Sequence, residues 1–310
     1  MNTGNSDRFA VFILTHGRPN RVLTYNALRR EGYTGDVYII IDNEDKTADE
    51  YRKRFGDKVI VFDKAAIAQT FDEGDNFNDR RAVIYARNAS FKIAQDLGLD
   101  YFLQLDDDYT DFRYKFSSAL IYKERTAIRD LDRLFATILD YYKSIPALTI
   151  AMGQGGDYMG GTESTTAEKI WMKRKAMNTF FCSTRRPFQF FGRINEDVNT
   201  YVTLGNRGGL FLTFFNVAIN QETTQQSAGG MTELYLDAGT YIKTFYTVMY
   251  APSCVKVYQV GHLHPRIHHK IKWEDAVPRI ISERHRVTEA SGQRLAGGGY
   301  VHSGPVATHD

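Results

Sequence analysis

The first 110 residues alternate short apolar runs with stretches of helical periodicity. Four runs of strand length lie at residues 9–14, 37–41, 59–62 and 101–105. Between them, residues 19–30 predict a helix with Pro19 at its first position, where proline is favoured. Residues 80–97 predict a second helix that places Tyr85, Ala89 and Ile93 on one face. Gly32 and Gly98 are the expected stops of these two helices. The strands read as continuous apolar runs, which is typical of parallel strands buried on both faces.

The remainder of the chain predicts further elements without a clear linker or internal repeat. Amphipathic spacing from Leu131 to Tyr142 predicts a helix. We expect strands at 148–152, 179–182, 209–217 and 244–249, and loops at 153–166 and 220–230, the second as a possible mobile lid. The alternation of strand and helix predicts an α/β fold with a mostly parallel central sheet flanked by helices, followed by a C-terminal extension.

Composition and charge narrow the class of protein only slightly. The chain has 310 residues, 43% of them hydrophobic, and a net charge of +2, as expected of a globular protein with a sizeable core. Two cysteines, Cys182 and Cys254, argue against a disulfide framework. No apolar run approaches the length of a membrane span, and residues 1–8 do not resemble a signal peptide. We therefore expect no membrane partner and a cytoplasmic protein; the oligomeric state is left open.

Three consecutive acids follow the fourth apolar run. In an open α/β sheet, ligands bind beyond the carboxyl ends of the strands, which is where Asp106, Asp107 and Asp108 are expected. Extended backbone would place Asp106 and Asp108 on one face. Adjacent carboxylates repel one another unless a cation balances them, and Mg²⁺ or Mn²⁺ prefers carboxylate and phosphate oxygens. A solvated acidic turn is the alternative interpretation of the triplet.

Four motifs in this order resemble the GT-A glycosyltransferase fold, a Rossmann-like α/β architecture. They are Phe-Ile-Leu-Thr-His-Gly-Arg-Pro-Asn-Arg (12–21), Ile-Ile-Asp-Asn (40–43), Tyr-Ala-Arg-Asn (85–88) and Leu-Asp-Asp-Asp (105–108). More narrowly, the chain resembles the TET-associated glycosyltransferases of bacteriophages, relatives of the base J glucosyltransferase, over roughly residues 9–275. On this resemblance we expect a donor-binding half at about 9–110 and an acceptor-binding half at about 145–290 of one domain, with a flexible tail at 291–310.

The resemblance implies donor and metal ligands. A nucleotide-sugar donor would contact Thr15, His16, Arg18, Asp42, Arg87, Asp106 and Asp107. Asp108 would bind the divalent ion directly, with Asp106 beside it. GT-A enzymes often add a C-terminal histidine to the metal, and His262 and His264 would point to one side after a strand. Each of these residues has an alternative interpretation as a capping, turn or structural side chain.

The resemblance also implies a general base. In inverting members, a carboxylate at the position of Asp197, or less favourably Glu196, takes the proton of the acceptor hydroxyl, which requires hydrogen-bond reach. The same two acids would also suit the first turn of a helix, where the dipole favours negative charge. Both interpretations are compatible.

A basic and aromatic segment bears on the acceptor. Seven Lys or Arg residues and no acid lie between Lys169 and Arg193, interleaved with aromatic side chains. Cations bind phosphates and aromatic faces stack on bases. The residues alone favour a solvated basic face over core aromatics, whereas the family resemblance implies DNA contacts at Lys173, Arg174, Arg185, Arg186 and Phe188. The basic residues of 262–286 would extend the same surface.

Together these features predict a metal-dependent glycosyltransferase. The expected reaction moves a sugar, with glucose favoured, from a UDP-sugar to the hydroxymethyl group of a 5-hydroxymethylpyrimidine in phage DNA, in the host cytoplasm. The alternatives are a glycosyltransferase or nucleotidyltransferase acting on a glycan or other acceptor, and a non-catalytic DNA-binding module. The sequence does not decide which sugar is moved, which pyrimidine accepts it, or whether the stereochemistry inverts.

Overall fold

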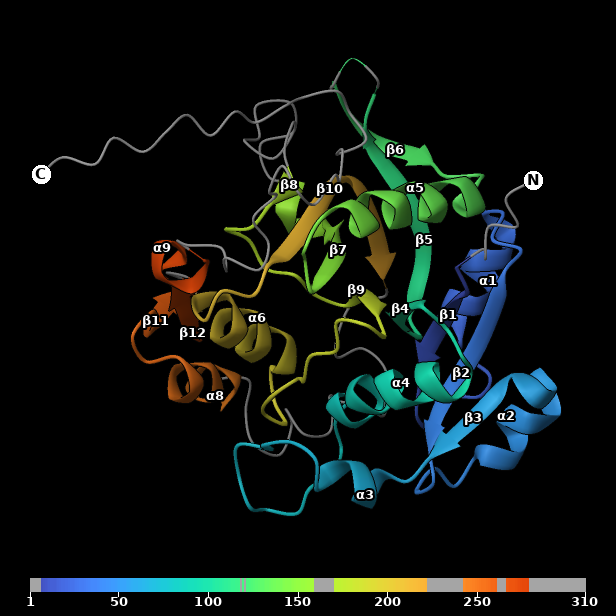
Figure 1. The fold of residues 1–310 in the computed structure, drawn as a ribbon, viewed down its shortest axis with the longest axis horizontal. Coiled ribbons are helices and arrows are strands. Elements are labelled where there is room, and N and C mark those ends of the chain that lie inside the picture. Colours follow the sequence, from blue (N-terminus) through green and yellow to red (C-terminus); the bar gives the residue numbers. More distant parts are fainter. Residues whose placement is uncertain are drawn as a thin grey trace, which may run out of the picture.

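The computed structural model describes residues 7–117, 119, 121–158, 170–221, 242–260 and 266–278. Their centre is a ten-stranded sheet in the order β3-β2-β1-β4-β9-β7-β10-β5-β6, with β8 paired to β10 (Figure 1). Its strands are β1 (Phe9–Leu14), β2 (Asp36–Asp42), β3 (Val59–Phe62), β4 (Tyr101–Asp106), β5 (Tyr109–Phe116), β6 (Tyr122–Ala127), β7 (Thr149–Gln154), β8 (Ile170–Trp171), β9 (Thr179–Ser183) and β10 (Phe211–Gln221). The predicted α/β fold is confirmed.

Strand direction divides the sheet. Strands β3, β2, β1 and β4 pair in parallel, and so do β7 and β10. Strand β9 is antiparallel to both β4 and β7, and so joins the two parallel groups. Most strands therefore run the same way, and the carboxyl ends of β1, β2 and β4 meet at one edge.

Helices cover both faces of the sheet. Alternate side chains of β1 point to opposite faces: Val11 and Ile13 join a core with α1 (Leu23–Arg30), α2 (Ala48–Phe55) and α5 (Leu131–Ser144). Ala10, Phe12 and Leu14 join a second core with α3 (Lys64–Ala68), α4 (Ile84–Asp96), α6 (Glu196–Asn206) and α9 (Trp273–Ala276). Both cysteines are buried and free. None of the helices in the described ranges has the length and apolar character needed to cross a lipid bilayer.

Two helices begin later than the sequence pattern predicts. The first begins at Leu23 rather than Pro19, because residues 18–23 form tight turns in which Arg21 N–H donates to the Arg18 carbonyl. The second begins at Ile84 rather than at residue 80, because the Asp79 carboxylate accepts the Arg81 N–H in a turn. At the end of α1, Gly32 has φ +85° and an added Cβ would lie 2.4 Å from the Arg129 carbonyl oxygen, so the predicted glycine stop is confirmed.

The strand predicted at 244–249 is wrong: this segment belongs to α8 (Ile242–Tyr250). Its aromatic and β-branched residues favour a strand in isolation. In the structure, Thr244, Tyr246 and Thr247 form the buried face of a helix, and Thr247 exchanges hydrogen bonds with Asn195 and Asn199 of the α6 region. Tertiary contacts therefore override the local preference. The predicted loop at 153–166 begins with the end of β7 and a 3-10 turn at Gly155–Tyr158, and its remaining residues lie outside the described ranges. In the predicted loop at 220–230, residues 220 and 221 belong to β10, and 222–230 lie outside the described residues.

Candidate functional site

The functional side chains meet where three parallel strands end. Leu14 lies opposite both Ile40 of β2 and Asp106 of β4 in the strand register. This register brings the residues that follow the three strands to one edge of the sheet: Thr15, His16, Asp42, Asp107 and Asp108. This convergence is the one predicted from the sequence.

Asp107 is turned toward the loop that follows β1. Its carboxylate accepts a hydrogen bond from the Thr15 hydroxyl at 2.6 Å, and the Arg18 guanidinium lies 3.4 Å away. Since the Thr15 hydrogen is used there, Tyr51 donates to Thr15 at 2.8 Å and accepts the Arg18 N–H at 2.8 Å. Burial raises the pKa of Asp107, and the bond from Thr15 opposes this rise. Asp107 therefore orders the first loop.

His16, Asp42 and Lys64 form a second cluster beside the first. The Asp42 carboxylate lies 2.8 Å from His16 Nδ1 and 3.3 Å from Lys64 Nζ. Burial acts to raise the pKa of Asp42, but the hydrogen bond from His16 and the charge of Lys64 outweigh it, so the pKa is lowered. The hydrogen bond to Asp42 raises the pKa of His16. At this edge the Asp42 carboxylate therefore lies between the Lys64 ammonium and a His16 imidazole whose protonated form it favours.

An open hollow lies beside these clusters. Its volume is about 380 Å³, within the range of small-ligand sites. The lining residues come from the loop after β1 and from the start of α2: Gly17, Arg18, Pro19, Asn20, Arg21, Thr47 and Glu50. The predicted donor residue Arg18 thus belongs both to the hollow and to the Asp107 cluster.

Arg87 links the aspartate triplet to the second acidic site. Its buried guanidinium donates to Asp106 at 3.0 Å and to Glu196 at 2.9 Å, and it lies over the Phe180 ring at 5.0 Å. Arg87 Nη1 is buried and has no hydrogen-bond partner among the described residues. Burial raises the pKa of Asp106 to about 6, although the charge of Arg87 opposes the rise.

Of the three aspartates, Asp108 has the fewest bonded partners to offset its negative charge. Within the described ranges no hydrogen bond or ion pair reaches its carboxylate from another side chain. Burial, with the charges of Asp106 and Asp107, raises its pKa to about 7. The backbone turns at Asp107 and Asp108, so the extended geometry expected for Asp106 and Asp108 ends at Asp106. The two carboxylates nevertheless remain close enough to influence each other's ionisation.

Asp197 lies in the first turn of α6, directly after Glu196, which Arg87 links to Asp106. Asn195, in left-handed backbone at φ +63°, precedes the helix, and Glu196 and Asp197 are buried in its first turn. The Asn195 side chain makes no capping bond to the helix and donates instead to Thr247. Burial and the neighbouring charge of Glu196 raise the pKa of Asp197 to about 7. The Glu196 carboxylate is bonded to Arg87, whereas among the described residues the Asp197 carboxylate accepts only the Val198 N–H.

A divalent cation fits the acids of this site. An uncompensated carboxylate beside two further acids is a donor set for a hard cation, and Mg²⁺ commonly takes one or two carboxylates together with phosphates and water. Within the described part of the chain, no three acidic, His or Cys side chains are grouped to hold a metal by themselves. Asp108 and Asp106 are the residues that would hold the ion. The predicted ligands His262 and His264 lie outside the described residues.

The residues predicted to contact DNA do not gather at this edge. Because β9 is antiparallel to β4, with Ser183 opposite Tyr101, Arg185 and Arg186 lie at the far end of β4 from Asp106. Arg185 pairs with Asp100 at 2.9 Å, and Arg186 donates to the Tyr142 and Ile145 carbonyls. Phe188 packs its ring against Phe91, Phe190 and Phe211 in the core.

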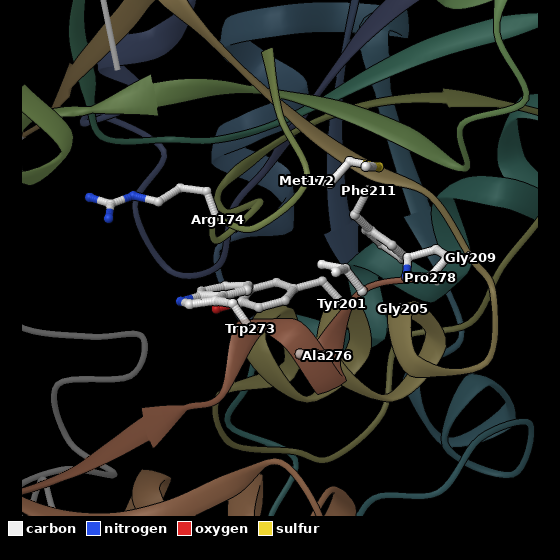
Figure 2. A pocket seen from close by; sticks show the side chains of 10 residues that line it. Met172, Arg174, Tyr201, Gly205, Gly209, Phe211, Trp273, Ala276 and Pro278 are labelled. Carbon is white, nitrogen blue, oxygen red and sulfur yellow. The ribbon is translucent and has the colours of Figure 1, made fainter. Parts of the chain in front are cut away.

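Lys173 and Arg174 lie elsewhere, after β8. Lys173 is 3.8 Å from Glu274, and Arg174 donates to the buried Asp157 at 3.0 Å. Figure 2 shows Arg174 among the residues that line a small pocket next to Tyr201 and Trp273. The structure thus places the five predicted DNA contacts in two separate regions.

Sequence reasoning missed three residues of the site. Tyr51 belongs to α2, a helix without a strong apolar stripe in the sequence. Asp45, which accepts the Gly17 N–H at 2.7 Å, and Lys64 follow strands β2 and β3. Ligand residues commonly follow the ends of parallel strands, which is the position of Asp45 after β2 and of Lys64 after β3.

Comparison with known proteins agrees with this arrangement. The model of the family described as TET-Associated Glycosyltransferase matches residues 9–230. No curated protein sequence matches the chain. Among solved structures, glucosyl-3-phosphoglycerate synthase from Mycobacterium tuberculosis, in complex with Mn²⁺, UDP and phosphoglyceric acid, is similar at 8% identity and a TM-score of 0.47, covering 86% of this chain and 87% of that one. A LgtC active-site mutant is similar at 11% identity and a TM-score of 0.32, covering 57% and 58%. Similarities at this level do not identify the donor, metal or acceptor of this chain.

Proposed function

Because the chain belongs to the TET-associated glycosyltransferase family, we propose that it transfers glucose from UDP-glucose, with a divalent cation, to the hydroxymethyl group of a 5-hydroxymethylpyrimidine in DNA. The observation that carries the proposal is the contact of Arg87 with both Asp106 and Glu196, which ties the strand end that carries Asp108 to the helix turn that carries Asp197. The DNA acceptor is supported by the family description alone. Phage origin is part of the same proposal.

The donor would lie across the carboxyl ends of β1, β2 and β4. Thr15, His16, Arg18 and Asp42 line the nucleotide side, where Asp42 is held ionised by His16 and Lys64. When bound at Asp108 and Asp106, a divalent cation supplies positive charge to the diphosphate that leaves with the nucleotide. Arg87, through its unpartnered Nη1, adds a fixed cation at the same edge. These groups stabilise the negative charge that develops on the leaving group.

Asp197 is the proposed general base. The acceptor hydroxyl oxygen forms a bond to the anomeric carbon while the bond from that carbon to the diphosphate oxygen breaks. The hydroxyl proton passes to the Asp197 carboxylate, and UDP leaves. A base with a pKa of about 7 is well matched to a reaction at neutral pH. Glu196 is less suited, since its carboxylate is bonded to Arg87. The single displacement inverts the anomeric configuration.

The test compares acceptors under one set of conditions. UDP release is measured with UDP-glucose and Mn²⁺ in the presence of duplex DNA that contains 5-hydroxymethylcytosine or 5-hydroxymethyluracil, unmodified DNA, or a free oligosaccharide. We expect release that depends on hydroxymethylated DNA and a product base heavier by one hexose. Release with the oligosaccharide alone would replace DNA by a glycan as the acceptor. Pyrophosphate release from a nucleoside triphosphate and a sugar phosphate would indicate a nucleotidyltransferase.

Asp108→Ala separates catalysis from binding. If the chain were a non-catalytic DNA-binding module, no nucleotide sugar would turn over, and Asp108→Ala would leave DNA binding unchanged. Thermal shift with a panel of nucleotide sugars, each with and without Mn²⁺, identifies the donor, because a ligand specific to the native state raises its apparent stability. Stabilisation by another nucleotide sugar, and none by UDP-glucose, would contradict the proposed donor.

A further inference from the structure

A two-stranded ribbon stands apart from the central sheet. Strands β11 (Val255–Val260) and β12 (Arg266–Ile271) pair only with each other, in antiparallel register, within the described residues. Figure 1 shows the ribbon next to α6 and α8, on the opposite side of the molecule from α2. The mechanism proposed above uses none of its residues.

The two faces of the ribbon differ. Side chains alternate along a strand, so Val255, His269 and Ile271 share one face. Val255 and Ile271 pack into the core with α4 and α6, and burial, with the charges of His268, Lys243 and Lys175, lowers the pKa of His269 to about 4. This face is the attached one, although its outer positions Val257 and Ile267 are exposed.

The opposite face is basic and aromatic. Lys256 lies directly across from Lys270, and Tyr258 directly across from His268. Both lysines are exposed, Tyr258 is 48% exposed, and the Lys270 ammonium lies 5.4 Å from the centre of the Tyr258 ring. Neither strand contains an acid. Among the described residues, no carboxylate forms an ion pair with Lys256 or Lys270.

This pairing is unfavourable for the isolated protein. Like charges directly opposite on neighbouring strands destabilise a sheet. A line of anionic groups that passes over the ribbon would relieve the repulsion between Lys256 and Lys270, and Tyr258 and His268 would offer rings beside it. A polyanion with regularly spaced charges and flat bases has this chemistry.

The ribbon is held to the helix that carries the proposed base. Trp273, two residues after β12, stacks on Tyr201 of α6 with ring centroids 5.7 Å apart and planes at 16°. Figure 2 shows these two rings side by side at the pocket. Tyr201 is four residues after Asp197, about one helical turn. A molecule on the ribbon would therefore lie near the acceptor side of the site.

We propose that the Lys256–Tyr258–His268–Lys270 face of the ribbon binds the phosphate backbone of the DNA acceptor. This inference rests on the proposed function and deepens it, since it locates the surface that holds the duplex while a base reaches Asp197. Lys270 belongs to the basic residues 262–286 that the sequence analysis adds to the surface, but the proposal replaces Arg185, which pairs with Asp100, and Arg186, which is bonded to backbone carbonyls, as the main contacts.

The experiment measures binding of a short fluorescein-labelled duplex by anisotropy over a range of salt concentrations. The test variant is Lys256→Gln/Lys270→Gln in the full chain. The matched control is Arg52→Gln/Lys53→Gln on α2, which removes the same charge from exposed positions. We expect the dissociation constant of the ribbon variant to rise at least about tenfold at low salt, and the slope of log K against log salt to fall by about 2. The control should match the wild type, as should UDP-induced thermal stabilisation of both variants.

The outcomes distinguish a failure of the ribbon inference from a failure of the proposed function. If the wild type binds and glucosylates DNA and the ribbon variant does so with equal affinity and slope, the ribbon inference is overturned and the proposed function stands. If the wild type transfers sugar only to a non-DNA acceptor and has no affinity for DNA, both are overturned. Loss of binding to phosphatidylserine-containing vesicles, with DNA binding unchanged, would assign the ribbon to a membrane surface and also overturn the inference.

Discussion

The buried guanidinium of Arg87 bonds through Nε to the carboxylate of Glu196 at 2.9 Å, across 109 residues of sequence. This ion pair joins the first turn of α4 to the first residue of α6. Arg87 also bonds to Asp106, so this one side chain links α6 to the aspartate triplet. Since Asp197 is the next residue of α6, the same contact positions the proposed base.

Replacement of Arg87 by Met should therefore destabilise the fold. The buried Glu196 and the partly exposed Asp106 would lose their counter-charge, and removing one partner of a buried ion pair costs about 3–5 kcal/mol. Urea unfolding measures the change in the free energy of unfolding. Arg52→Met, at an exposed position of α2, is the control and should change it by less than about 0.5 kcal/mol.

The double variant Arg87→Met/Glu196→Gln gives a sharper test of the same contact. Because it removes one of the stranded charges, it should be less destabilised than the sum of the two single variants. Additive effects would show that Arg87 and Glu196 do not interact energetically, whatever their distance.

Neighbouring acids of the triplet should respond differently to substitution. Asp107→Asn weakens the bonds from Thr15 and Arg18, so we expect a loss of about 1–3 kcal/mol in stability. Asp108→Asn removes an uncompensated acid, so the metal-free protein should keep its stability or gain on the order of 1 kcal/mol. Thermal shift with UDP should show that Mn²⁺-dependent stabilisation disappears in Asp108→Asn. If Mn²⁺-dependent stabilisation persists in Asp108→Asn, the metal does not bind at Asp108.

Much of the site was predictable because it depends on strand ends. The apolar runs before Thr15, Asp42 and Asp106 are long enough to mark parallel strands, and parallel strands bring their carboxyl ends together. What was not predictable is which way each carboxylate points. Asp107 turns to Thr15 and Asp106 to Arg87 because of the tight turn after β4 and the position of α4, and neither is visible in the local sequence.

Predictions from the sequence are wrong where long-range contacts determine the local structure. The segment of α8 contains β-branched and aromatic residues, yet Tyr246 and Thr247 are buried against α6 and its preceding loop as a helix. The basic and aromatic residues interleaved before α6 predict a surface, and the family resemblance implies DNA as its partner. Arg193 is in fact 2% exposed and pairs with Asp75 at 2.8 Å, a partner 118 residues away that charge patterning does not reveal.

Arg186 should prove more important for stability than for DNA binding. Its guanidinium bonds to the Tyr142 carbonyl at 3.1 Å, bonds also to the Ile145 carbonyl, and lies 4.1 Å from the Tyr142 ring centre, so it caps the end of α5. Arg186→Met should lower the free energy of unfolding by about 1.5–3 kcal/mol, the range for hydrogen bonds to a charged group. Duplex affinity measured below the unfolding temperature should stay within about twofold of wild type. A large loss of affinity with normal stability would instead support the DNA contact predicted from the sequence.

The pH dependence of turnover tests Asp197 directly. The base must be ionised, and burial together with Glu196 raises its pKa to about 7, so kcat/KM should rise tenfold per pH unit below about 7 and level off above it. Asp197→Asn should lower kcat by about 10²–10⁴-fold and leave UDP affinity unchanged. The same ionisation affects stability with the opposite sign. Because the folded pKa exceeds the ordinary aspartate value of 3.8, the contribution of Asp197 is fully present below 3.8 and is lost as pH rises toward about 7. Asp197→Asn should therefore flatten the decline in unfolding free energy across this window, and an unchanged decline would mean that Asp197 ionises as an ordinary exposed acid.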